Sequence, residues 1–160
     1  MYSEKLLIFI SSLIFSNSRR SSDENLVWTY FYKLYKILPS ERKSKCVEIF
    51  TRKEPSPTFL PLKIAERLQN IRSICMEYLV DAIERRKMID EDLHTFLATL
   101  FIEEILECQD LEKRDEIRQQ FRQFMIHTNY LKVQLLIGKL QNTSLRFELA
   151  ILHGKVKTMH

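Results

Sequence analysis

One histidine in this chain stands beside three carboxylates, and this group is the most open to acid–base chemistry. His94 follows Asp90, Glu91 and Asp92 in the sequence. A carboxylate beside an imidazole can orient a general base. The same residues also fit the first turns of a helix, where carboxylates satisfy a histidine without any reaction. We therefore expect His94 to be structural.

The other side chains that could bind a metal or share a proton are scattered. Glu103, Glu104 and Glu107 fit a solvated acidic helix face better than a pair of catalytic carboxylates. The sequence has no glycine-rich phosphate loop, nucleophile elbow or metal-ligand spacing. We expect no enzyme, metal or cofactor, and buried, reduced thiols. The cysteines and remaining histidines are Cys46, Cys75, Cys108, His127, His153 and His160.

Three arginines could bind anions together. Arg114, Arg118 and Arg122 recur every four residues, which puts them on one face of a helix. Asp110 and Asp115 stand beside this stripe and weaken it as an anion site. The formal net charge is +4, and the other basic residues form small separate groups. Nucleic-acid binding through this stripe is an alternative hypothesis. The leading expectation is that the chain has no nucleic-acid partner.

Aromatic side chains cluster near the beginning of the chain, where they could stack on bases. At helical spacing such residues more commonly pack in a core, and we predict that role here. The cluster contains Trp28, Tyr30, Phe31, Tyr32 and Tyr35.

Composition favours helices throughout. Of the 160 residues, 45% are hydrophobic and 29% charged, and only 2 are Gly and 4 Pro, so the turn chemistry of an all-β protein is missing. Apolar residues recur at helical spacing in about nine segments joined by short loops. We predict an all-α fold, a single α-solenoid segment of antiparallel helix pairs over residues 1–160, with linkers near 17–22 and 51–58. A closed helical bundle is the alternative.

The central stretch, residues 71–107, reads as two helices folded back on each other. Cations at Arg85, Arg86 and Lys87 suit the end of the first helix, and Asp90 can cap the second. Both helices carry apolar stripes that need a partner. We predict an antiparallel hairpin.

The two ends of the chain raise separate questions. Residues 2–15 fit an amphipathic helix, although the apolar run from Leu6 to Phe15 also resembles a signal peptide. The last predicted helix stops at residues 157–160 with no further helix to cover it. We expect the chain to be a fragment of a longer helical array.

Several sequence strings, in register, resemble the helical region of the TGF-beta receptor-associated protein family and, more distantly, of its HOPS-complex relative. The longest are EYLVDAIERRKMIDEDLHTFLATLFIEEILE and LRFELAILHGK. LVWTYFYKLY, VEIFTRKEPSP and YLKVQLLIGKL match in the same order, so the resemblance covers residues 25–155. The motif residues, read as structural, are Trp28, Phe50, Tyr78, Leu79, His94, Leu97, Leu100, Glu103, Glu104, Leu149, His153 and Gly154.

This resemblance implies a non-enzymatic scaffold segment of an endosomal tethering subunit of the CORVET or HOPS type. It implies class C core subunits and Rab GTPases as partners, and a cytoplasmic place on early endosomes, vacuoles or lysosomes. The family is also linked to TGF-beta receptors and Smad proteins, so an adaptor for them is the alternative. The family's N-terminal propeller and its later repeats are missing here. Rab binding and complex assembly are therefore expected to need those parts.

Overall fold

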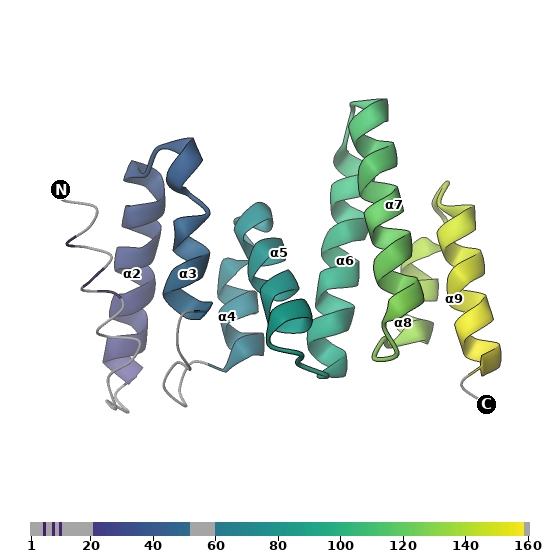
Figure 1. Ribbon diagram of the computed structural model, residues 1–160, viewed down its shortest axis with the longest axis horizontal. Helices are drawn as coiled ribbons and strands as arrows, with labels where there is room; N and C mark the ends of the chain where they lie inside the picture. Colours follow the sequence, from purple (N-terminus) through teal and green to yellow (C-terminus); the bar gives the residue numbers. More distant parts are fainter. Residues whose placement is uncertain (1–4, 6–7, 9, 11–20, 52–59, 159–160) are drawn as a thin grey trace. The chain divides into compact units, whose positions relative to one another are not determined.

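The computed structural model of the protein describes residues 5, 8, 10, 21–51 and 60–158 (Figure 1). Within this part the chain forms eight α-helices, one short 3-10 helix and one π-helical turn, without strands. The chain divides into two compact units, Met1–Lys87 and Met88–His160. Helices pack against one another in pairs, so the predicted all-α fold of α-solenoid type is confirmed.

The described part of the first unit contains one long helix and three short ones. The long helix α2 (Ser21–Ile37) stops two residues before Pro39, as a proline requires. The 3-10 turn η1 (Ser40–Arg42) leads into α3 (Lys45–Thr51). Helix α4 (Pro61–Leu68) begins with a proline, and α5 (Arg72–Val80) packs against both α3 and α4.

Helix α5 continues into a π-helical turn, η2 (Asp81–Arg85). This turn is wider than a turn of α-helix, because the Arg86 N–H donates to the carbonyl of Asp81, five residues earlier in the chain, at 3.1 Å. The turn ends at Lys87, whose φ of 56° lies in the left-handed region. Glycine usually occupies that position, so a lysine there is strained.

The core of the first unit is aromatic. The rings of Trp28 and Phe50 stack with centroids 5.3 Å apart, and Phe31 lies 5.4 Å from Phe50. Tyr78 on α5 meets Phe50 edge-on at 6.3 Å. Trp28 is 3% exposed, and the other three are fully buried. The predicted packing role of the aromatic cluster is therefore confirmed for Trp28 and Phe31, whereas Tyr30, Tyr32 and Tyr35 are half-buried.

The second unit consists of two pairs of helices. Helices α6 (Glu91–Glu107) and α7 (Leu111–His127) form one pair, joined by a three-residue turn (Figure 1). Helices α8 (Val133–Leu140) and α9 (Arg146–Thr158) form the other. Helix α9 also packs against α7, and α8 against α6, so the pairs share one core.

The start of α7 shows how local sequence positions a helix. The Asp110 side chain accepts hydrogen bonds from the N–H groups of Glu112 and Lys113, at 3.0 and 3.3 Å. Asp90 occupies the corresponding place before α6, but its side chain makes no capping bond. The cap expected at Asp90 is therefore absent, whereas Asp110 does cap α7.

Several expectations change at the level of single residues. Leu111 and Leu135, two of the apolar residues that recur at helical spacing, are 73% and 47% exposed. The helix expected from Ser40 begins at Lys45, because residues 40–42 form a separate turn. Helix α2 already includes residues 21 and 22 of the expected linker.

The expected hairpin would join α5 and α6 across the two units, and it stays a prediction. Most of the expected helix or signal segment at 2–15, and residues 52–58 of the second linker, lie outside the described residues.

Candidate functional site

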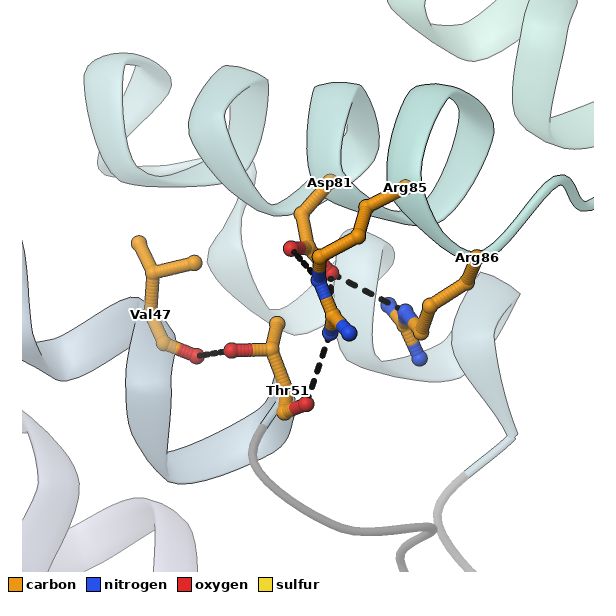
Figure 2. A network of polar contacts seen from close by, with 5 residues as sticks. All are labelled: Val47, Thr51, Asp81, Arg85 and Arg86. Atoms are coloured by element: carbon orange, nitrogen blue, oxygen red, sulfur yellow. Dashed lines mark hydrogen bonds and ion pairs between the residues drawn. The ribbon is translucent and has the colours of Figure 1, made fainter.

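An ion-pair cluster joins the end of α5 to the end of α3 in the first unit (Figure 2). Asp81 accepts a hydrogen bond from Arg85 Nε at 2.6 Å and one from Arg86 Nε at 3.0 Å. Arg85 Nη2 also donates to the Thr51 carbonyl at 2.8 Å. That carbonyl lies at the C-terminus of α3, where a cation satisfies the helix dipole and its last oxygens. The cluster therefore ties two helix ends together.

The two arginines of this cluster differ in exposure. The Arg85 side chain is 58% exposed, whereas that of Arg86 is 17% exposed and lies 5.1 Å from the Tyr78 ring centroid. Burial raises the pKa of the Tyr78 hydroxyl, although Arg86 opposes this shift. The phenol consequently stays protonated at neutral pH. The arrangement suits a structural clamp, and it contains no nucleophile.

A buried carboxylate is the main electrostatic feature of the second unit. Glu148 on α9 is 0% exposed, and both of its oxygens accept hydrogen bonds from Arg118, at 2.9 and 3.0 Å. Arg122 donates a third bond, 2.9 Å long, to the same carboxylate. Both arginines lie on α7, so the ion pairs join α7 to α9. Two arginines of the stripe that we considered as a site for an external anion are therefore paired inside the protein.

The protonation of Glu148 depends on a competition. Burial alone would raise the pKa of this carboxyl, but hydrogen bonds from Arg118, from its own N–H and from Arg122 outweigh burial, so the pKa lies below its usual value. Hydrogen bonding to Glu148 also raises the pKa of Arg118. Glu148 and Arg118 are therefore both charged at neutral pH.

His94 is fully engaged by hydrogen bonds inside the second unit. Its Nε2 lies 2.8 Å from the Met88 carbonyl, which can only accept, so Nε2 carries the proton. Nδ1 lies 2.7 Å from the Thr128 hydroxyl. The ring is 4% exposed and stacks on Phe124. Backbone and hydroxyl groups thus satisfy His94, instead of the neighbouring carboxylates that the sequence suggested.

The loop that contains Thr128 is held from two further sides. Lys155 on α9 donates to the Thr128 carbonyl at 2.7 Å, and burial lowers the pKa of this amine. The Lys132 N–H donates to Thr95 Oγ1 at 3.0 Å, while its ammonium pairs with Asp92. These contacts fix the connection between α7 and α8 against α6 and α9.

Two surface features of the second unit could meet a partner. Phe147 on α9 is 58% exposed, and the Arg122 guanidinium lies over its ring, 4.4 Å from the centroid. A separate pocket of about 360 Å³ opens beside the start of α8. It is lined by Glu91, Leu131, Lys132, Val133, Gln134, Leu135 and Val156.

The structure distributes the predicted motif residues between core and surface. Trp28, Phe50, Tyr78, Leu79, His94, Leu97 and Leu100 are buried. Leu149 and Glu104 are half-buried, and Glu103, His153 and Gly154 are exposed. No single site gathers them.

Cys46 and Cys75 are buried free thiols, and burial raises the pKa of Cys46 to about 11, whereas Cys108 is only half-buried.

Glu148 and Phe147 escaped the sequence analysis. A signal for Glu148 was present, because it lies three residues after Leu145 and four before Leu152, both fully buried. A carboxylate on an apolar helix face, opposite a helix with an arginine stripe, indicates a buried ion pair. Nothing in the local pattern marked Phe147.

The described residues contain neither a candidate metal site nor a candidate membrane span. No group of three or more His, Cys, Asp or Glu side chains among them could bind a metal ion. None of their helices is both long and apolar enough to cross a membrane.

Known proteins with similar sequences all carry the same description. The chain is 31% identical over 144 residues to the mouse transforming growth factor-beta receptor-associated protein 1, a match covering 84% of this chain and 16% of the relative. The human protein is 28% identical over 143 residues, with the same coverage of both chains. A zebrafish homolog is 32% identical over 96 residues, covering 56% of this chain and 11% of its own length.

The first two of these relatives are much longer than this chain, which spans about one sixth of their length. No protein-family model matches the sequence, and no solved structure matches it significantly. The similarity confirms the resemblance noted from the sequence strings.

Proposed function

Because this chain is related in sequence to the transforming growth factor-beta receptor-associated protein family, we propose that it is a non-enzymatic scaffold segment of an endosomal tethering subunit. The observation that carries the proposal is the match along 84% of the chain to relatives with that one description. Paired helices fit the role, since such arrays present extended surfaces to partner proteins.

The proposed partners follow from the family resemblance. They are the class C core subunits of CORVET- or HOPS-type complexes, with Rab GTPases reached through other parts of the assembly. The proposed place is the cytoplasmic face of early endosomes, extending to vacuoles or lysosomes. The occupied ring nitrogens of His94 support the non-enzymatic role, because the residue best suited to acid–base chemistry is already hydrogen bonded.

A second function is favoured by the name of the relatives, which describes association with the transforming growth factor-beta receptor. An adaptor that binds this receptor and Smad proteins would also need an extended helical surface. The nucleic-acid alternative receives no such support, since Arg118 and Arg122 are already paired with Glu148.

Affinity purification tests the proposal. The protein is tagged in the genome of its source organism, so that it is purified together with any parts beyond these residues. Class C subunits, TGF-beta receptors and endosomal markers are then quantified against a Phe50→Ala variant that disrupts the core. Enrichment of class C subunits with the native chain, and its loss in the variant, is the expected result. Receptors without class C subunits would favour the adaptor, and enrichment of neither would remove the tethering role.

A further inference from the structure

Two polar atoms near the end of α5 are buried without a partner. The Tyr78 side chain is 0% exposed, and its hydroxyl makes no hydrogen bond to any other described group. The Nη2 atom of Arg86 is buried in the same condition. A buried polar atom without a hydrogen bond is costly, and nearly all such atoms in folded proteins are bonded to protein or to ordered water. Both atoms therefore need a partner.

The two atoms belong to one small region of the first unit. The Arg86 guanidinium lies over the Tyr78 ring, with its Cζ 5.1 Å from the ring centroid. Burial is the largest influence on the pKa of the Tyr78 hydroxyl; Arg86 then lowers this pKa and Asp81 raises it, so both charges act on the same oxygen. Tyr78, Asp81 and Arg86 therefore bring their polar groups together where α5 continues into η2.

The Asp81 carboxylate can accept one further hydrogen bond. Its Oδ2 accepts from Arg85 Nε at 2.6 Å, and its Oδ1 accepts from Arg85 Nη2 at 3.1 Å and from Arg86 Nε at 3.0 Å (Figure 2). A carboxylate has about four acceptor positions, so one position is left. The region thus contains a guanidinium that needs an acceptor, a hydroxyl that needs a partner, and a carboxylate that can accept a donor.

We propose that a single water molecule binds between Tyr78, Arg86 and Asp81. Its oxygen accepts one hydrogen bond from Arg86 Nη2 and one from the Tyr78 hydroxyl, and the water donates one hydrogen bond to the Asp81 carboxylate. Buried waters typically make about three hydrogen bonds of this kind, to polar groups that are otherwise unsatisfied. This binding site goes beyond the scaffold role and is independent of it.

A water molecule fits these groups better than an ion does. An anion would meet the Asp81 carboxylate, and it would lose its hydration in a place where both unpartnered atoms are shielded from solvent. A metal cation would meet the Arg86 guanidinium. A water molecule adds no charge, and it can both accept and donate, which this combination of two donors and one acceptor requires.

The bound water connects the ion-pair cluster to the aromatic core. Tyr78 meets Phe50 edge-on, with ring centroids 6.3 Å apart, and Arg85 of the cluster donates to the Thr51 carbonyl at the end of α3. Through the water, the hydroxyl of a core ring joins the charges that fasten the ends of α3 and α5. A phenylalanine at position 78 would fill the same space in the core but could not make this connection.

Oxygen-17 magnetic relaxation dispersion of water tests the site, because its amplitude reports water molecules that stay inside a protein for longer than the protein takes to tumble. The native protein is compared with Tyr78→Phe, which removes one oxygen and keeps the ring, and with Arg86→Met, which removes the other partner. Tyr32→Phe is the matched control, since the half-buried Tyr32 donates directly to the Arg67 carbonyl. Circular dichroism confirms that the variants fold, and urea denaturation gives their midpoints.

The expected result for Tyr78→Phe is a changed dispersion, either a loss of amplitude equal to one water molecule or faster exchange of that water, together with a lower urea midpoint. Arg86→Met should show the same change in dispersion, and Tyr32→Phe should show none. An unchanged dispersion in Tyr78→Phe would overturn the proposal, and with a lower midpoint it would indicate a direct bond to Arg86. A higher midpoint would also overturn it, because the hydroxyl would then have no partner.

Discussion

The two units place their charges differently with respect to their cores. In the first, the cluster of Asp81, Arg85 and Arg86 lies at the edge of the aromatic core around Phe50, where Arg86 meets the Tyr78 ring, and its carboxylate is 21% exposed. In the second, the Glu148 carboxylate is fully buried between α7 and α9. A charge at the edge of a core adds little stability, whereas a buried one must be paired and makes stability depend on that pairing. The first unit should therefore respond to packing changes and the second also to charge changes.

Core truncation should have the largest effect, and it should be similar in both units. Phe50→Ala removes the ring between Trp28 and Tyr78, at an expected loss of about 4 kcal/mol. Leu97→Ala in α6, where the residue is 1% exposed, should lose about 3 kcal/mol. Urea denaturation with hydrogen exchange, which localises the loss, measures both. A loss below about 1 kcal/mol in either would show that its packing is misassigned.

Removing a carboxylate charge should destabilise the second unit more than the first. Glu148→Gln leaves Arg118 and Arg122 without a carboxylate and is expected to lose about 3 kcal/mol, detected as faster hydrogen exchange in α7 and α9. Asp81→Asn is the matched change in the first unit and should cost clearly less, because Arg85 remains hydrated. Equal losses in the two variants would contradict the comparison.

Lowering the pH should reduce the stability of the protein mainly by protonating Glu148. Its folded-state pKa lies below that of an unfolded glutamate, about 4.3, so the stabilisation is complete above that value and is lost as pH falls through the folded pKa. The difference in urea midpoint between the native chain and Glu148→Gln should therefore be constant from pH 7 to about 5. It should shrink progressively below about pH 4. A difference that persists unchanged to pH 2 would show that Glu148 is not charged in the folded protein.

The smallest expected effect is a gain in stability from a substitution at the end of the first unit. Lys87 has a φ of 56°, which costs a side-chain-bearing residue about 1 kcal/mol relative to glycine. Lys87→Gly should raise the free energy of unfolding by up to that amount in urea denaturation. Lys87→Ala keeps the strain and controls for loss of the charge, so an equal gain in both variants would assign the effect to charge.

Several helix ends follow from local signals, although the helix expected from Ser40 begins only at Lys45. Asp110 and its N–H partners, Pro61 at the first turn of α4, and the stop before Pro39 are all local interactions, so neighbouring residues suffice to predict them. The π-helical turn at Asp81–Arg85 was missed. Its sequence reads as continuous helix, and the widened turn has no local signature.

Exposure of single residues followed the sequence less closely. Leu111 and Leu135 belong to the apolar residues of their helices, but both are exposed. His94 was expected to be satisfied by nearby carboxylates, and its partners Thr128 and Met88 come from the loops that precede and follow its helix pair.

The sequence by itself determined that this chain is helical, where most of its helices start and stop, and to which family it is related. These properties depend on side-chain spacing and on contacts within a few residues along the chain. Only the tertiary structure decided that Glu148, 30 residues away from Arg118, pairs with two of the three arginines of the stripe. Electrostatic pairing depends on distance in space, and that distance exists only once α7 and α9 are packed together.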